Sequence, residues 1–292
     1  MKNVLSLNNL TKKYDKFTMG GITIDIPCGF STALIGSNGA GKTTLLETIC
    51  GLSGKYEGQA TFFEKYTNPD DPYVRMQTGY CSASLFPVFW DIRKTEYMMS
   101  AAFKNFSSKK FRELCKSMQI DIKKNQKILE MSAGTSMKLI LAATLARDTD
   151  LLILDEPASA LDPLMRDRLC GMFRNYLAEK DGERSVLFST HNIADMEYVT
   201  DYAIIMANGK IIEHGFTEEL KEKYCMVNGD TVNAEKAKPY MLSFTINDTI
   251  YEGLAPKENY EKLLLCDAAV ETPSLQQISV ELLRNAENEG MI

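Results

Sequence analysis

The stretch that decides the fold reads Gly36-Ser37-Asn38-Gly39-Ala40-Gly41-Lys42-Thr43. Residues 31–35, which we predict to be a short buried strand, precede it, and apolar residues at helical spacing follow from Lys42 onward. The pattern G-x-x-x-x-G-K-[ST] binds phosphates when it lies between a strand and a helix. We therefore predict a phosphate-binding loop here, and the simpler interpretation of a solvated glycine turn does not account for this context.

The residue types of the loop suit a nucleoside triphosphate. Glycines let backbone N–H groups converge on phosphates at the positive end of a helix. We expect Lys42 to neutralise the charge of the β- and γ-phosphates and Thr43 to offer its hydroxyl to Mg²⁺. Thr44 is counted with the loop residues that contact ATP. The predicted ligands are therefore ATP and Mg²⁺.

An acidic pair follows a second apolar run. Residues 151–154 are all Leu or Ile, and Asp155 and Glu156 come directly after them. We predict that Asp155 holds Mg²⁺, usually through water, and that Glu156 orients the water that attacks the phosphate. An acidic pair alone is a weak signal because many turns are acidic. Behind a phosphate-binding loop it becomes a strong one.

The composition is that of a globular protein. The chain has 292 residues, of which 45% are hydrophobic and 25% are charged, so wholesale disorder is excluded. The formal net charge of -6 argues against a broad nucleic-acid-binding face, because phosphate backbones are bound through clustered Lys and Arg. We therefore expect no nucleic-acid partner.

The cysteines and the start of the chain indicate the compartment. Seven cysteines are scattered without a C-x-x-C pair, which fits neither a disulfide framework nor a zinc site. The N-terminal residues lack an apolar signal core, and no stretch approaches the ~18 apolar residues of a membrane span. We expect a cytoplasmic protein whose membrane role is through a partner.

Periodicity divides the chain into parts. Residues 4–10 and 22–26 alternate apolar and polar side chains, which predicts half-buried strands. Helical spacing replaces this pattern between about residues 95 and 129. Strands and helices then alternate, with a short helix near residues 193–198 and a hairpin that turns at residues 208–209. This order predicts a largely parallel sheet.

We expect two domains. The first spans residues 1–222 and includes a helical subdomain at about residues 90–145. The second spans residues 223–292 and is a small accessory domain. It contains short strands, such as residues 241–246, and a final helix opened by the cap residue Thr272 and the following proline.

Four further motifs resemble those of ABC ATPases. Residues 155–163 read Asp-Glu-Pro-Ala-Ser-Ala-Leu-Asp-Pro and resemble the DEPTSGLDP block of that family. Residues 189–191, Ser-Thr-His, resemble its H-loop, and residues 131–135 stand where its LSGGQ signature belongs. Tyr14 stands where the family has an aromatic residue that stacks on adenine. The resemblance covers roughly residues 4–220 in the right order.

The resemblance implies a fold. It is an α/β P-loop NTPase fold with an N-terminal antiparallel β subdomain and a helical subdomain. A small C-terminal α+β accessory domain, as in the simple exporters of the family, completes the expected architecture.

The resemblance also implies a mechanism. Two subunits would close head-to-tail around two ATP molecules, with Ser132 and Gly134 of one subunit reaching the γ-phosphate bound by the other. His191 would sense that phosphate, and Asp162 would cross the interface. The expected catalytic residues are Glu156, His191 and Lys42. A structural His191, or a Tyr14 that merely covers the sheet, is the alternative for those two residues.

Two motifs depart from the family pattern. Ala83 stands where the Q-loop glutamine is expected, which leaves water, Ser82 or Ser84 as substitutes. The signature has Ala133 and Thr135 in place of Gly and Gln. Two arrangements remain open: a homodimer that carries both alterations twice, and pairing with a non-identical ATPase subunit.

The altered signature and the ending at residues 271–282 resemble those of simple exporters for peptides, antibiotics and lipids. The nearest resemblance is to bacterial systems for antimicrobial or cytolytic peptides and related resistance. The expected partners are a second ABC ATPase subunit, identical or homologous, and an integral-membrane permease. The chain would then be cytoplasmic and peripheral to the membrane through the permease.

Two other functions compete with transport. One is a non-transport ABC ATPase, which usually has two P-loops or a long coiled-coil insertion, whereas this chain has one P-loop and no sustained heptads. The other is a weakly hydrolysing nucleotide-binding regulator, motivated by Ala83 and Ala133. The aromatic residues Phe86, Phe89 and Trp90 belong either to the core or to a surface for a permease helix.

Overall fold

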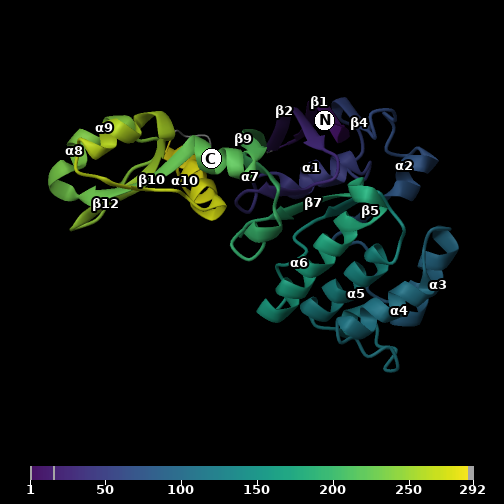
Figure 1. The fold of residues 1–292 in the computed structure, drawn as a ribbon. Coiled ribbons are helices and arrows are strands. Elements are labelled where there is room, and N and C mark those ends of the chain that lie inside the picture. Colours follow the sequence, from purple (N-terminus) through teal and green to yellow (C-terminus); the bar gives the residue numbers. More distant parts are fainter. Residues whose placement is uncertain (1, 16, 289–292) are drawn as a thin grey trace. The chain divides into compact units, whose positions relative to one another are not determined.

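The computed structural model describes residues 2–15 and 17–288 (Figure 1). Two compact units emerge. The first comprises the chain up to Thr32 together with residues 42–190, and the second comprises residues 33–41 and the chain from His191 onward. Each unit is described by itself.

The first unit contains a three-stranded antiparallel sheet in the order β2-β1-β4. Its strands are β1 (Asn3–Tyr14), β2 (Phe17–Pro27) and β4 (Glu57–Phe62). Leu7 of the central strand lies opposite Ile24 on one side and Ala60 on the other. The alternation of apolar and polar residues buries one face of this sheet, as period-2 patterning requires. The predicted antiparallel β subdomain is confirmed.

Three parallel strands form the interior of the first unit: β5 (Thr78–Cys81), β6 (Leu151–Leu154) and β7 (Ser185–Thr190). Every residue of β6 and β7 is buried. A strand covered on both faces has no polar side to present, which explains the continuous apolar run of β6. The carboxyl end of β6 leads directly into Asp155.

Helices pack beside these strands and against one another (Figure 1). They are α1 (Lys42–Ile49), α2 (Pro72–Gln77), α3 (Ile92–Ala102), α4 (Ser108–Ser117), α5 (Ala133–Leu145) and α6 (Pro163–Ala178), with short 3-10 turns at Ile128–Glu130 and Lys180–Gly182. Asp91, Ser107, Ser132 and Asp162 cap α3 to α6 by accepting a backbone N–H in the first turn. Helix α4 packs against α5, and the stretch predicted to have helical spacing contains α4 and most of α3.

The second unit receives the end of β3 (Ser31–Ile35) and contains the hairpin of β8 (Tyr202–Ala207) and β9 (Lys210–Phe216). The hairpin turns at residues 208–209 as predicted. Helix α7 (Thr217–Lys223) follows it. The short helix predicted near residues 193–198 is only a 3-10 turn, Glu197–Val199.

A four-stranded sheet in the order β11-β12-β10-β13 follows in the second unit. Its strands are β10 (Tyr224–Asp230), β11 (Thr245–Ile246), β12 (Ile250–Pro256) and β13 (Ala269–Glu271). The short helices beside it are α8 (Ala234–Ala237) and α9 (Tyr260–Leu264), with 3-10 turns at Thr231–Asn233, Lys238–Tyr240 and Lys257–Asn259. The strand predicted at residues 241–246 is mostly irregular, because the N–H groups of Leu242 and Ser243 both donate to the carbonyl of Leu254.

The last helix, α10 (Leu275–Asn288), begins later than predicted. Ser274 Oγ accepts from Gln277 N at 3.1 Å, and Gln277 Oε1 accepts from Ser274 N at 2.9 Å. This reciprocal pair is a capping box, which satisfies two backbone donors at once. Ser274, not Thr272, is therefore the cap residue, and the prediction was wrong by two residues.

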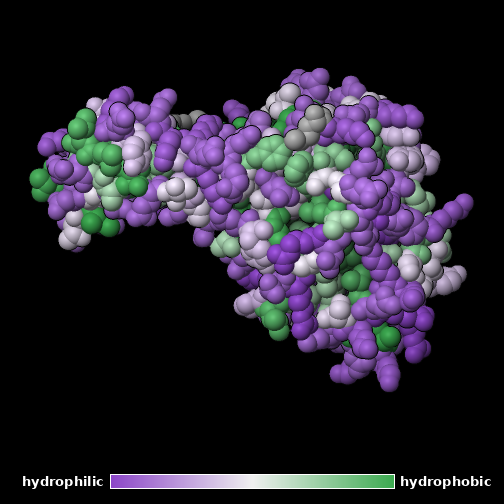
Figure 2. All heavy atoms as spheres, viewed as in Figure 1, coloured by the Kyte–Doolittle hydropathy of each residue, from purple (hydrophilic) through white to green (hydrophobic). Residues whose placement is uncertain are grey.

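Some apolar side chains of the second unit stay at its surface. Val232 and Leu265 are 84% and 86% exposed, and Ile246 is also exposed. Figure 2 shows hydrophobic spheres over the part of this unit that contains α8 and β12. In the part of the chain that the structure describes, no helix is both long and apolar enough to cross a membrane.

Candidate active site

The phosphate-binding loop connects β3 to α1. Its Ala40 N–H donates to the carbonyl of Ser37 at 3.2 Å, which tightens the turn. Gly39 and Gly41 have φ angles of 86° and 103°, which side chains with a Cβ rarely adopt. Lys42 is the first residue of α1. The loop therefore ends at a helix N-terminus, where free N–H groups attract anions.

Asp155 lies beside Thr43 at the end of β6. Thr43 Oγ1 donates to Asp155 Oδ2 at 2.8 Å, and Ser189 Oγ donates to Asp155 Oδ1 at 2.5 Å. The N–H of Asp155 donates to the carbonyl of Cys81 at 2.7 Å, which ties the ends of β6 and β5 together. Asp155 is 8% exposed, and the two hydroxyl donors hold its carboxylate in one orientation.

These two residues suit the predicted magnesium ion. A hydroxyl and a carboxylate oxygen side by side are hard oxygen ligands, which Mg²⁺ prefers. Among the described residues, no group of three or more His, Cys, Asp and Glu side chains could hold a metal ion. Mg²⁺ in nucleotide sites takes one or two protein ligands and completes its shell with phosphates and water. Thr43 and Asp155 are sufficient for that arrangement.

Glu156 pairs with the loop lysine. Its Oε1 lies 3.4 Å from Lys42 Nζ, with only 6% of the lysine side chain and 23% of the glutamate side chain exposed. The backbone of Glu156 has a φ of 48°, an uncommon conformation for a residue with a Cβ. Its N–H donates to Ser189 Oγ at 2.8 Å. The strained backbone is thus held by the same serine that orients Asp155.

Ser189 was missed as a site residue. The sequence pattern identified it only as the first residue of the Ser-Thr-His motif. Its hydroxyl nevertheless accepts a hydrogen bond from the backbone N–H of Glu156 and donates one to Asp155. It is fully buried in β7, which pairs in parallel with β6. The sequence signal that could have identified Ser189 is a polar residue near the end of an apolar strand, two residues before the predicted site residue His191.

His191 and Tyr14 are both accessible. His191 directly follows β7 and is exposed. Tyr14, at the end of β1, is 47% exposed, with Lys12 Nζ 5.3 Å from its ring centroid. Lys12 itself is buried and donates to the carbonyls of Ser53 and Lys55. The tyrosine ring is therefore available for stacking and has a fixed cation beside it.

The signature residues stand at the start of α5. Ser132 caps the helix by accepting from Thr135 N at 3.2 Å, and it is exposed. A Cβ on Gly134 would lie 2.6 Å from the carbonyl oxygen of Ala160, so only glycine fits there. Ala133 is exposed, so its methyl group points away from the packed side of α5.

Asp162 joins the signature helix to α6. Its Oδ1 accepts from Met165 N at 3.0 Å, and its Oδ2 lies 3.8 Å from Lys138 Nζ of α5. The hydrogen bond from Met165, assisted by the charge of Lys138, holds the pKa of Asp162 below its usual value. The carboxylate is therefore ionised at neutral pH. Lys138, like Ser189, was not predicted from the sequence to be a site residue.

The altered Q-loop follows β5. Ala83 is exposed, whereas Ser82 is buried, and the hydroxyls of Ser82 and Ser84 lie 3.2 Å apart. Cys81, which bonds to the backbone of Asp155, immediately precedes them. Strand β5 is thus followed by the hydroxyls of Ser82 and Ser84, in the segment where the family pattern has the side-chain amide of a glutamine.

Known proteins with a similar sequence or structure are ATP-binding proteins of ABC transporters. A family model described as "ABC transporter" matches residues 19–159, a range that includes the phosphate loop, the signature and the Asp155–Glu156 pair. The zinc import ATP-binding protein ZnuC of Wolbachia sp. subsp. Brugia malayi is 30% identical over 237 residues, which are 76% of this chain and 90% of that protein.

Human ATP-binding cassette sub-family A member 10 is 31% identical over 234 residues, 76% of this chain. The chain spans only 15–17% of the length of that protein and of its human relatives, members 6 and 9. A solved structure described as the ATP binding subunit of an ABC transporter superposes with a TM-score of 0.63 at 23% identity, over 75% of this chain and 92% of that one. The predicted fold is confirmed by this likeness.

Proposed function

The chain belongs to the family of ABC transporter ATP-binding proteins, and from that premise we propose that it hydrolyses ATP as part of a subunit pair that drives export through a separate permease. The observation that carries this proposal is the double pairing at the end of β6. Thr43 Oγ1 bonds Asp155 and Lys42 pairs with Glu156, and this supports the proposal because the residues proposed to bind phosphate and Mg²⁺ lie beside the carboxylate proposed to orient water.

In the proposed reaction, the γ-phosphate of ATP competes with Glu156 for Lys42. When the lysine turns to the phosphate, the Glu156 carboxylate is released to accept a hydrogen bond from the attacking water. Thr43 and Asp155 would hold Mg²⁺, which would supply positive charge next to the phosphates. Ser189 keeps Asp155 and the backbone of Glu156 in place throughout.

The proposed dimer uses the start of α5. Ser132 is exposed at the N-terminus of this 13-residue helix, where the N–H groups and the helix dipole favour an anion. Ser132 and Gly134 of one subunit would complete the phosphate site of the other. The close contact of Gly134 with Ala160, together with the Lys138–Asp162 pair, would move the signature and the adjacent loop as one body.

The proposed permease contact lies in the segment around Phe89. Phe89 and Val88 are 69% and 52% exposed, and Leu129, whose N–H donates to the carbonyl of Val88, is 72% exposed. Phe86, in contrast, is buried and stacks on Trp90 with ring centroids 5.8 Å apart. The predicted patch is thus an exposed Phe89 supported by a Phe86–Trp90 stack.

The proposal also includes the direction of transport, which is export, and a location at the inner face of the membrane. They rest on the likeness of the signature and the C-terminal ending to those of simple exporters. Among those exporters, the nearest resemblance is to bacterial systems for antimicrobial or cytolytic peptides. Because the relative ZnuC is named for zinc import, transport direction needs its own experiment.

That experiment uses membrane vesicles that contain this subunit and its permease, with a dye-labelled cationic amphipathic peptide as cargo. Export predicts ATP-dependent accumulation in inside-out vesicles, abolished by Glu156→Gln. Accumulation in right-side-out vesicles loaded with ATP would contradict export. Phosphate release without accumulation in either orientation would favour the non-transport ATPase.

A second measurement concerns the pairing. The purified chain should hydrolyse ATP slowly by itself if it needs a non-identical partner that supplies a standard signature, and the rate should rise sharply when that subunit is added. Strong, cooperative hydrolysis by the chain alone would establish the homodimer instead. No phosphate release in either case would favour the nucleotide-binding regulator.

A further inference from the structure

Glu197 joins the segment that follows His191 to the start of the last helix. Its Oε1 accepts a hydrogen bond from the backbone N–H of Leu275 at 2.9 Å, and its Oε2 accepts one from that of Gln276 at 3.3 Å. Helix α7 lies beside α10 (Figure 1), and the Nζ of its Lys221 lies 3.5 Å from Oε1. One carboxylate therefore connects its own 3-10 turn, α7 and α10 within the second unit.

The surroundings of Glu197 strengthen these contacts. The side chains of Glu197 and Lys221 are only 21% and 24% exposed, so water screens their attraction in part. The first N–H groups of a helix lack partners inside the helix, and the positive end of the helix dipole favours a carboxylate there. Hydrogen bonds to an ionised acceptor are also stronger than neutral ones. The carboxylate of Glu197 is therefore well suited to hold its segment on α10.

Helix α10 belongs to the same unit as the phosphate-binding loop. It packs against β8, and its Ile278 is fully buried. Strand β8 backs the loop, because a Cβ on Gly36 would collide with the carbonyl oxygen of Met206. At the end of the hairpin, the N–H of Gly209 donates to the carbonyl of Ala40 at 2.8 Å. The start of α10 is thus connected through β8 to the loop that binds the phosphates.

The chain between His191 and Glu197 lies outside any helix or strand. Ile193 and Met196 are buried, and the N–H of Met196 donates to the carbonyl of Ile193 at 2.8 Å. Thr200 Oγ1 donates to the carbonyl of Met196, also at 2.8 Å. Because no ladder of hydrogen bonds supports this segment, its position depends on such individual contacts. Loss of the contact at Glu197 should therefore change the position of His191.

We propose that Glu197 is a positioning residue for ATP hydrolysis, which holds His191 at the distance from the phosphate-binding loop that the γ-phosphate requires. This inference rests on the proposed function, since that function gives His191 its role at the phosphate. The first turn of α10 then contributes to catalysis, because it binds the carboxylate that positions the histidine. Glu197 is not among the residues proposed to contact ATP, so its removal should change the rate of hydrolysis and not the affinity for ATP.

The first test compares Glu197→Ala with wild type in steady-state ATP hydrolysis. Because a misplacement of about 1 Å can cost on the order of 10²-fold in rate, we expect kcat to fall roughly 10- to 100-fold while the KM for ATP stays within about two-fold. Glu197→Gln keeps an oxygen that can accept from Leu275 but loses the attraction to Lys221, so its kcat should lie between the two. An unchanged kcat in Glu197→Ala, or a change confined to KM, would overturn the proposal. If Glu197→Ala does not fold, Glu197→Gln replaces it under the same criteria.

The second test determines whether Glu197 acts through His191. Single-turnover hydrolysis is measured for His191→Ala with and without Glu197→Ala. The second substitution should have no further effect in this background, because the side chain that Glu197 positions has been removed. A general loosening of the unit would lower the rate whether or not His191 is present. A loss of equal size in both backgrounds would therefore overturn the proposal.

The matched control is Glu218→Ala. Glu218 also pairs with Lys221, at 3.2 Å, but its side chain is 83% exposed and it precedes Lys221 on the same helix. This variant should leave both kcat and KM unchanged. A loss as large as that of Glu197→Ala would place the effect at Lys221 and would overturn the role of α10.

Failure of the proposed function would look different. Wild type that releases no phosphate, or His191→Ala that hydrolyses ATP at the wild-type rate, would count against the proposed function. Normal hydrolysis by wild type, slow hydrolysis by His191→Ala and an unchanged rate in Glu197→Ala would count against the positioning role alone.

Discussion

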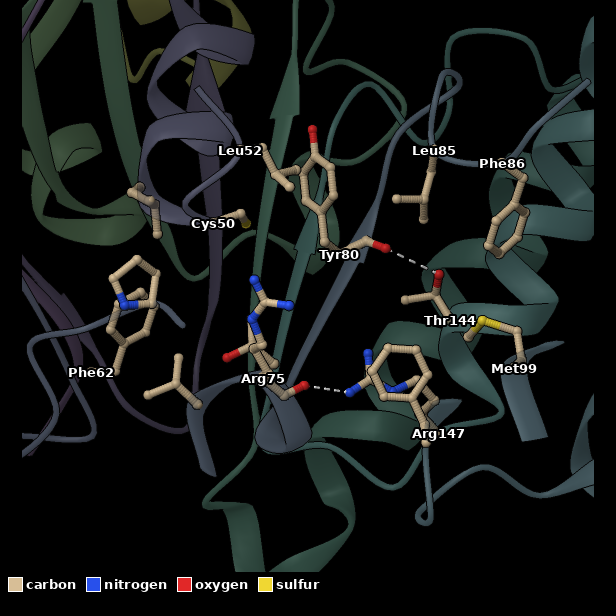
Figure 3. Close-up of a pocket in the computed structure, with 15 residues that line it drawn as sticks. Cys50, Leu52, Phe62, Arg75, Tyr80, Leu85, Phe86, Met99, Thr144 and Arg147 are labelled. Carbon is tan, nitrogen blue, oxygen red and sulfur yellow. Dashed lines mark hydrogen bonds between the residues drawn. The ribbon is translucent and has the colours of Figure 1, made fainter. Parts of the chain in front are cut away.

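Two regions of the first unit differ in how they satisfy buried charge. One is the end of β6, and the other is an apolar cavity of about 230 Å³ beside β5 that Arg147 lines (Figure 3). At β6, the carboxylate of Asp155 is bonded by Thr43 and Ser189, and Lys42 is paired with Glu156. In the cavity, Arg147 has carbonyls and a ring as neighbours but no carboxylate partner among the described residues. An anion that binds Lys42 must compete with Glu156, whereas an anion that binds Arg147 would displace no carboxylate of the described residues.

The largest expected effect comes from breaking the internal pair. Glu156→Gln should lower the rate of ATP hydrolysis roughly 10²–10³-fold, because it removes the carboxylate that we propose orients the attacking water. ATP affinity should be retained, because Lys42 then leaves no ion pair behind, and ATP-dependent dimers should accumulate. Phosphate release, nucleotide binding and size-exclusion chromatography measure the three effects.

The control for that variant is Glu57→Gln, which removes an exposed carboxylate paired with Lys13 at 3.0 Å. It should change neither hydrolysis nor dimerisation. Wild-type turnover in Glu156→Gln would show that another group orients the water and would remove the contrast between the two regions.

A second pair of variants separates the wall of the cavity from the exposed surface beside it. Phe86→Ala should lower the free energy of unfolding by about 3 kcal/mol, because it enlarges the cavity and removes the stack on Trp90. Phe89→Ala, at a 69% exposed position, should leave the melting temperature unchanged but weaken co-purification with the permease. Equal melting temperatures for the two variants would show that Phe86 is not a wall of the core.

Packing beside the signature gives a smaller effect. Gly134→Ala should lower the free energy of unfolding by about 1–3 kcal/mol, because its Cβ would meet a backbone carbonyl that has little freedom to move. Gly171→Ala in α6 is the matched control, since nothing lies within 4 Å of its Cβ. It should raise stability by roughly 0.5–1 kcal/mol. Thermal melts that move in the same direction would contradict the close contact.

The smallest expected effect concerns the ion pair of Glu213 and Lys223, which lies outside both regions. Burial alone would raise the pKa of Glu213, but hydrogen bonds from Lys223 and Tyr224 outweigh it and hold the pKa below its usual value. The stability that this carboxylate contributes is therefore present at neutral pH and is lost as the pH falls through its folded-state pKa. The gap in melting temperature between wild type and Glu213→Gln should be widest at pH 7 and should close below about pH 4.

The control for the pH experiment is Glu218→Gln, because the side chain of Glu218 is 83% exposed. It should lower the melting temperature little at either pH. A gap for Glu213→Gln that persists unchanged in acid would show that its ionised form is not the stabilising one.

Several features of the fold were predictable because the signals are local. Alternation along β1 and β2, the apolar run of β6 and the turn at residues 208–209 each depend on neighbours in the chain. The predictions failed where a local signal had a rival. Ser274 rather than Thr272 caps α10 because Gln277 stands where it completes a capping box. The strand predicted at residues 241–246 was mostly lost to a shared carbonyl of Leu254.

The sequence by itself determined the family, the phosphate-binding loop and the acidic pair, because these depend on residue type and short-range spacing. Only the tertiary structure decided that Ser189 bonds both Asp155 and Glu156, that Lys138 meets Asp162, and that Arg147 is buried with no acidic partner in the described part of the chain. Each of those facts joins residues from separate elements. Their distance depends on how strands pair and helices pack, which the order of the residues states only indirectly.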